Sequence, residues 1–117
     1  MLEIYCYNRC STCQKAITYL LDNKIDFELR DIVGDHPNYD EMNDIIKRSG
    51  KSIEKFFNTS GILYREEKLK DKLPKMSYEE KLTKLVSDGK LIKRPLLVSP
   101  KIVLNGFSEN EWSLLKK

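Results

Sequence analysis

The residues best suited to chemistry form a Cys-x-x-Cys motif, Cys10-Ser11-Thr12-Cys13, near the start of the chain. A helical pattern begins at this motif, so Cys10 is predicted to lie at a helix N-terminus. Unpaired backbone N–H groups and the helix dipole at that end favour negative charge and lower the pKa of a thiol. We therefore expect Cys10 to be the nucleophile and Cys13, one turn later on the same face, to resolve a mixed disulfide at Cys10. The hydroxyls of Ser11 and Thr12 are candidate donors to the thiolate.

Two other interpretations of the cysteines stay open. Cys-x-x-Cys can be half of a zinc site, for which a full set of ligands would be Cys6, Cys10, Cys13 and His36. Cys6, however, belongs to a stretch whose alternation points it into the core, and His36 lies in a distant loop. The second interpretation is a pair of unrelated buried thiols. A Cys-x-x-Cys pair in a cytosolic βαβ context favours redox chemistry over both, so we expect neither a metal nor another cofactor.

Composition limits the kind of protein that carries this motif. The chain has 117 residues, of which 33% are charged and 40% apolar, and its three cysteines are too few for a disulfide framework. This fits a single domain, 1–117, with a modest core. Apolar runs such as 96–98 fall far short of the ~20 residues that span a bilayer, and no signal-peptide pattern is present. We therefore expect a cytoplasmic protein without membrane contact, whose thiols are kept reduced.

Charge is distributed unevenly along the chain. Residues 22–44 hold eight acids and two bases, whereas residues 47–75 hold nine bases and four acids. The acids in the basic stretch are interleaved with the bases, as on an ordinary solvated surface. No groove-reading motif or stacking platform accompanies the basic stretch, so we expect no direct binding of nucleic acid.

The elements that position the motif begin with a strand–helix–strand unit. Alternation predicts a strand at 2–7, helical spacing predicts a helix from Cys10 to about Asn23, and alternation returns at 25–32. A crossover of this length favours parallel strands in a right-handed βαβ unit. Ser11 and Gln14 also fit a capping box, which would place Cys10 just before the helix cap.

Helices are predicted for most of the middle of the chain. Helical spacing indicates a helix over 38–49, and Ile53, Phe56 and Phe57 suggest a short one, while 61–75 has no clear pattern. Ser77 and Glu80 form a capping box, so a further helix is predicted there, with Gly89 as its stop signal. We expect this helical insertion to span about 38–90.

The C-terminal part returns to strands. Residues 96–98 and 102–104 are predicted to form a tight antiparallel hairpin. Ser108 and Glu111 fit another capping box, and Phe107 with Trp112 fits a hydrophobic staple, so a final helix should follow. The resulting order of βαβ, helical insertion and ββα is an α/β fold, with a mixed sheet flanked by helices.

These residues together resemble the glutaredoxin-linked arsenate reductase family (ArsC) and its sister group, the Spx-type regulators. The resemblance rests on Tyr-x-x-x-x-Cys-Ser-Thr-Cys, which starts at Tyr5, and on Leu-Ile-Lys-Arg-Pro-Leu-Leu-Val at 91–98, and it covers nearly the whole chain. It implies a thioredoxin-like fold, with the nucleophile at Cys10, an arginine of the site at Arg94 and a cis-proline at Pro95. A guanidinium fork suits an oxyanion or carboxylate and would stabilise a nearby thiolate. The alternative for Arg94 is an ordinary surface arginine.

The chain departs from the pattern of the enzymes in this family. Those enzymes use three arginines, and the other two fall near Asn58 and Gly106 in this chain. Arg9 or Arg65 would then have to compensate if a dianionic oxyanion is to be held, which puts arsenate reduction in doubt. The resemblance nevertheless implies a thiol–disulfide oxidoreductase that is reset by a thioredoxin- or glutaredoxin-type reductant.

The Spx-type regulators provide the alternative function. They share Cys-x-x-Cys as a redox switch and bind the α subunit of RNA polymerase. Their polymerase-contacting glycine falls on Ser52 and the arginine of their switch on Ser60. The shared residues therefore favour an enzyme, with a redox-sensing transcriptional regulator as the second hypothesis.

Overall fold

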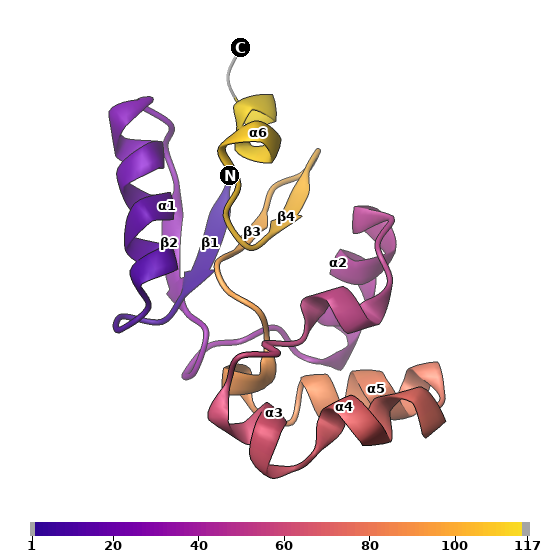
Figure 1. Ribbon diagram of the computed structural model, residues 1–117. Helices are drawn as coiled ribbons and strands as arrows, with labels where there is room; N and C mark the ends of the chain where they lie inside the picture. The colour runs from indigo at the N-terminus through magenta and orange to yellow at the C-terminus, as the bar shows by residue number, and fades with distance from the viewer. Residues whose placement is uncertain (1, 116–117) are drawn as a thin grey trace.

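A four-stranded mixed sheet forms the centre of the computed structural model, which describes residues 2–115 (Figure 1). The strand order is β2-β1-β3-β4, with bounds β1 (Glu3–Cys6), β2 (Glu28–Asp31), β3 (Leu96–Val98) and β4 (Val103–Asn105). β1 pairs with β2 in parallel and with β3 antiparallel, and β3 and β4 form the antiparallel hairpin. The α/β class, the mixed sheet and the βαβ opening are therefore confirmed. No helix within 2–115 is both long enough and apolar enough to cross a membrane.

Alternation along β1 divides the core between the two faces of the sheet. Ile4 and Cys6 pack in one cluster with Trp112 and with the inner side of helix α1 (Ser11–Asp22). Tyr5 belongs to a second cluster, formed with the helices that follow β2. The division arises because successive side chains of a strand point to opposite faces. Cys6 is thereby placed on the face of the sheet that α1 covers.

Helices fill the segment between β2 and β3. Their bounds are α2 (Tyr39–Ser49), η1 (Ile53–Phe56), α3 (Ile62–Glu66), α4 (Leu69–Lys72), η2 (Leu73–Lys75), α5 (Tyr78–Leu85) and η3 (Gly89–Leu91). The capping box of Ser77 and Glu80 is present, and a second one joins Asn38 and Glu41 at the start of α2. Figure 1 shows α3, α4 and α5 grouped at one end of the molecule, beyond the sheet.

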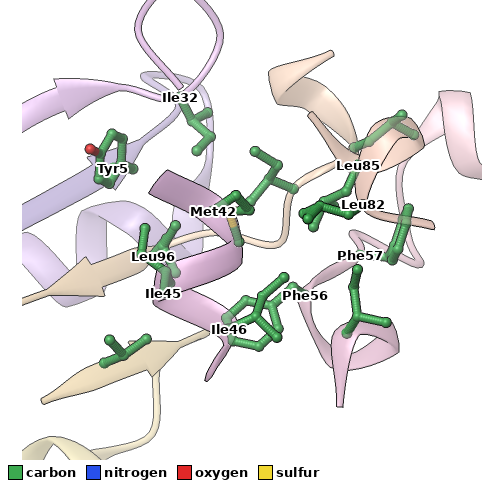
Figure 2. Packing of buried hydrophobic residues seen from close by; sticks show 14 of the residues in the cluster. Tyr5, Ile32, Met42, Ile45, Ile46, Phe56, Phe57, Leu82, Leu85 and Leu96 are labelled. Carbon is green, nitrogen blue, oxygen red and sulfur yellow. The ribbon is translucent and has the colours of Figure 1, made fainter. Parts of the chain in front are cut away.

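The inner face of α2 connects this group of helices to the sheet. Met42, Ile45 and Ile46 are each at most 4% exposed and lie in one cluster with Phe56 and Leu82 (Figure 2). Burial of an apolar side chain of this size stabilises the fold by about 1.5–3 kcal/mol. The helices between β2 and β3 therefore share one hydrophobic core with this face of the sheet.

The predicted stop signal at Gly89 is wrong. α5 ends at Leu85 with Val86 as its C-cap, whereas Gly89 begins η3 and lies against the backbone of Ile32. The glycine is therefore needed for close packing of two chain segments. This long-range contact leaves no local signal in the sequence, so the glycine has the same pattern as a helix stop.

The final helix, α6 (Glu109–Trp112), is present and continues as η4 (Ser113–Leu115), but its predicted capping box is wrong. Ser108 is the N-cap but its side chain makes no cap bond, and the Glu111 carboxylate pairs with Lys51 Nζ at 3.2 Å. The hydrophobic staple is confirmed by edge contact between the rings of Phe107 and Trp112, whose centroids are 5.0 Å apart.

A short antiparallel pairing ties the insertion to the start of β3. Phe57 and Ile92 form a β-bridge, the Asn58 N–H donates to the Leu91 carbonyl at 2.8 Å, and the Lys93 N–H donates to the Phe56 carbonyl at 2.7 Å. This pairing fixes the loop after η1 beside the residues that lead into β3.

Candidate functional site

Cys10 is the N-cap of α1, which confirms its predicted place at a helix N-terminus. Its carbonyl accepts the Gln14 N–H at 3.2 Å, and its own N–H donates to the Tyr7 carbonyl at 3.0 Å. No side chain caps the helix and its first turn carries no acid, so the capping box of Ser11 and Gln14 is wrong. The first N–H groups of a helix have no intrahelical partner and form its positive end. Cys10 therefore lies at the positive end of α1.

The three thiols of the chain lie in one hydrogen-bonded group. Cys13 is fully buried, Cys6 is 6% exposed and Cys10 is half-buried. A hydrogen bond with Cys6 is the main cause that lowers the pKa of Cys13 to about 7, with further help from the Tyr7 backbone, the Cys10 thiol and the charge of Arg94, against the effect of burial. The pKa of Cys6 is raised, because its proton is held in the bond to Cys13 and because it is buried.

Cys6 thus differs in one respect from the inert core thiol that the sequence suggested. The burial of Cys6 is confirmed, but its hydrogen bond also stabilises the thiolate of Cys13. A thiolate is the reactive form of cysteine, and the lowered pKa of Cys13 favours that form. The structure therefore provides a buried thiol with a lowered pKa one turn after Cys10.

Of the four candidate zinc ligands, His36 lies apart from the three cysteines. His36 lies against the far end of α5, where its Nε2 is 2.8 Å from the Val86 carbonyl oxygen. Within residues 2–115, no group of three or more His, Cys, Asp or Glu side chains is placed to hold a metal ion.

An open cleft of about 930 Å³ lies in front of Cys10. It is bounded by four segments, namely the β1–α1 loop, residues 58–63, the residues between η3 and β3, and the start of the β4–α6 connection. Thr12 lines this cleft together with Cys10, whereas Ser11 is exposed and is not part of the lining. Of the two hydroxyls predicted to serve the thiolate, only that of Thr12 is therefore at the cleft.

Arg94 lines the same cleft and is held in place by its neighbours. Its Cζ lies 4.9 Å from the centroid of the Tyr7 ring, and its NH1 is 3.5 Å from the Lys90 carbonyl. The peptide bond to Pro95 is cis, as the resemblance implied, and the Pro95 carbonyl accepts the Gly106 N–H at 2.8 Å. Arg94 is therefore a partly buried cation aimed at the cleft and not an ordinary surface arginine.

Several lining residues were not identified as part of the site from the sequence. Tyr7, Lys90 and Lys93 line the cleft. Arg9 and Arg65, one of which would have to compensate for the missing arginines if a dianionic oxyanion is held, are exposed and lie outside the lining. The one signal in the sequence was the run Lys-Arg-Pro, which places a second cation directly beside Arg94.

Comparison with known proteins gives consistent matches over almost the whole chain. A model of the ArsC family matches residues 5–115. The uncharacterized protein YusI of Bacillus subtilis (strain 168) is 41% identical over 111 residues, which are 95% of this chain and 94% of YusI. The regulatory protein MgsR of the same organism is 27% identical over 116 residues, 99% of this chain and 90% of MgsR.

The fold is matched equally well among solved structures. The crystal structure of an ArsC family-related protein from Bacteroides fragilis superposes with a TM-score of 0.96 at 47% identity. The match covers 98% of this chain and 97% of that one. The strand order and the helices between β2 and β3 therefore belong to an architecture already seen by experiment.

Proposed function

The chain belongs to the ArsC family, and on this premise we propose that it is a thiol–disulfide oxidoreductase using Cys10 and Cys13 as its redox pair. The thiolate of Cys10 attacks a sulfur of the substrate disulfide, so that a mixed disulfide forms and one thiolate leaves. The thiolate of Cys13 then attacks the Cys10 sulfur, forming the Cys10–Cys13 disulfide and releasing the second thiolate. An external dithiol of the thioredoxin or glutaredoxin type reduces this disulfide and is itself oxidised.

The observation that carries the proposal is the difference in access between the two thiols. Cys10 opens onto the cleft, whereas Cys13 is fully buried behind it with a pKa lowered to about 7. A resolving thiol must lie close enough to attack the first cysteine and must be a thiolate at the pH of the reaction, but it needs no contact with solvent. Cys13 meets these requirements, and Cys10 alone is placed to meet an incoming substrate.

Arg94 has the role of an anion holder in this proposal. Its guanidinium lies at the cleft and lowers the pKa of Cys13 through its charge. It would stabilise thiolate leaving groups and hold an oxyanion or carboxylate next to Cys10. Pro95, which follows Arg94 through a cis peptide bond, is buried and supports this part of the cleft wall.

A turnover assay tests the proposal directly. The assay offers arsenate and a model disulfide as alternative substrates, each with thioredoxin and with glutathione as reductant. We expect turnover of at least one pair and its loss in Cys10→Ser, while Cys13→Ser should form a mixed disulfide that accumulates. An absence of turnover with every pair, or full turnover in Cys10→Ser, contradicts the proposal.

A second candidate function is a redox-sensing regulator that binds the α subunit of RNA polymerase. It is favoured by the similarity to MgsR, which spans 99% of this chain. A pull-down with the C-terminal domain of the α subunit, under oxidising and reducing conditions, distinguishes the two. Binding that depends on the Cys10–Cys13 state, without catalytic turnover, would support the regulator.

A further inference from the structure

The side chain of Lys93 occupies the space next to Gly106 in which another residue would place its side chain. A Cβ on Gly106 would lie 3.0 Å from Lys93 Cε and 3.5 Å from Lys93 Nζ. Gly106 also has φ +76, a backbone conformation that side chains rarely adopt. The glycine thus permits both the turn after β4 and the path of the lysine across it.

The ammonium of Lys93 has no anionic partner among residues 2–115. The nearby Lys51 provides the contrast, since its Nζ is bonded to Asn105 Oδ1 at 2.7 Å and paired with Glu111 Oε2 at 3.2 Å. The backbone of Lys93 is nevertheless fixed, because its N–H donates to Phe56. Lys93 is therefore a cation whose base is held in place and whose charge is available to a ligand.

Lys93 lies between two hollows of the surface. It lines the cleft that contains Cys10, and it also lines an adjoining hollow of about 360 Å³ together with Lys51 and Lys55. Arg94, the next residue, lines the same cleft and lies against the Tyr7 ring. Both cations therefore line the cleft that contains Cys10, and Lys93 also lines the adjoining hollow. The cleft lining holds two acids as well, Glu66 and Glu111, of which Glu111 is paired with Lys51.

We propose that Lys93, seated over Gly106, is a specificity-determining residue that selects reaction partners of Cys10 carrying a carboxylate or an oxyanion. The proposal deepens the proposed function and shares with it only the assignment of Cys10 as the reacting thiol. A positive charge without a counter-ion raises the local concentration of anions and stabilises them on arrival. A lysine suits this role because its ammonium is a mobile point charge that accepts anions of different shape.

Alkylation of Cys10 by two reagents of nearly equal size measures this selection. Iodoacetate and iodoacetamide both form a carbon–sulfur bond with the thiolate and release iodide, but only iodoacetate is an anion. The ratio of their rate constants therefore reports the charge near Cys10, whereas the ionisation of the thiol affects both rates alike. The modified residue is located by fragmentation of the tryptic peptide 10–15.

We expect Lys93→Gln to lower the iodoacetate to iodoacetamide ratio by about three- to tenfold at low ionic strength, the effect of a unit charge at a partly exposed site. The rate with iodoacetamide should stay nearly constant. Added salt should shrink the difference between the native protein and Lys93→Gln. Lys93→Arg keeps the charge and should keep most of the ratio, and Lys101→Ala, which removes a charge in the β3–β4 turn, should not change it.

A second variant tests the position of the Lys93 side chain over Gly106 and leaves its charge unchanged. Gly106→Ala leaves Lys93 in the chain but places a Cβ against its Cε, so we expect the same fall in the ratio. A circular-dichroism melt of each variant establishes that it is folded. An unchanged ratio in folded Lys93→Gln overturns the proposal, even if the protein turns over disulfides. A lowered ratio in a protein without turnover supports it and leaves only the oxidoreductase assignment contradicted.

Discussion

The guanidinium of Arg94 lies over the ring of Tyr7, with Cζ 4.9 Å from the ring centroid. Tyr7 follows β1 and Arg94 precedes β3, so the contact joins two neighbouring strands just outside the sheet. A cation over an aromatic face gains about 0.5–1 kcal/mol at a partly exposed site. The ring therefore helps to hold the charge of Arg94 at the cleft that contains Cys10.

Replacement of Tyr7 should accordingly weaken the action of Arg94. We expect Tyr7→Leu to lower kcat/KM for an anionic substrate by about two- to fivefold, which corresponds to the energy of the cation–π contact. Tyr7→Phe retains the ring face and should remain close to the native value. Steady-state kinetics of both variants give the comparison, and an equal loss in the two would assign the effect to the hydroxyl.

Oxidation should join Cys10 and Cys13 and leave Cys6 free. Trypsin cleaves after Arg9 and Lys15, so Cys10 and Cys13 share one peptide while Cys6 lies in another. A Cys10–Cys13 disulfide therefore lowers the mass of the peptide 10–15 by two hydrogen atoms, as read by mass spectrometry without reduction. Linkage of this peptide to the one that contains Cys6 would show that the pair has been assigned incorrectly.

The reactivity of Cys13 should depend on pH with an inflection near 7. Its pKa is lowered to about 7 from an ordinary value of 9.0, so its thiolate fraction rises as pH increases through 7. Treatment of Cys10 with Ellman's reagent gives a mixed disulfide, and attack by Cys13 releases a coloured thiolate. The rate of release should increase with pH up to a plateau above pH 7.

Removal of Cys6 should move this inflection upward. Its hydrogen bond is the largest cause that lowers the pKa of Cys13, and Cys6→Ala cannot replace it. Cys6→Ser keeps a donor at the same place, so its profile should stay closer to that of the native protein. Identical profiles for the native protein and Cys6→Ala would show that Cys6 only fills space.

Two glycines give a matched test of packing. A Cβ on Gly89 would lie 1.8 Å from the Ile32 carbonyl oxygen, whereas a Cβ on Gly50 would meet nothing within 4 Å. Gly89→Ala must therefore move the backbone and should lower the free energy of unfolding by at least about 2 kcal/mol. Gly50→Ala, at φ 72, should cost only about 1 kcal/mol for the left-handed conformation. Urea unfolding measures both, and equal losses would contradict the close packing of Gly89.

The sequence by itself determined the order of the elements and the position of the redox motif. The alternation before Cys10, the helical spacing after it and the Ser77–Glu80 box are local signals, since each depends on residues within one or two turns. For the same reason, the start of α1 at the motif and the hairpin of β3 and β4 were predicted within a few residues. Pro95 was identified through the resemblance, because X-Pro bonds are rarely cis in general.

The tertiary structure alone decided which charges and thiols meet. Lys51 pairs with the Glu111 carboxylate, which was predicted to cap α6. The backbone of Ile32 lies so close to Gly89 that a Cβ would clash, and the side chain of Lys93 passes over Gly106. In the same way, Cys6 reaches Cys13 only because β1 and α1 pack face to face. Each contact joins residues whose separation in the chain carries no periodic or capping signal. Its energy depends on distance and burial, which exist only once the sheet, α1 and the helical insertion have come together.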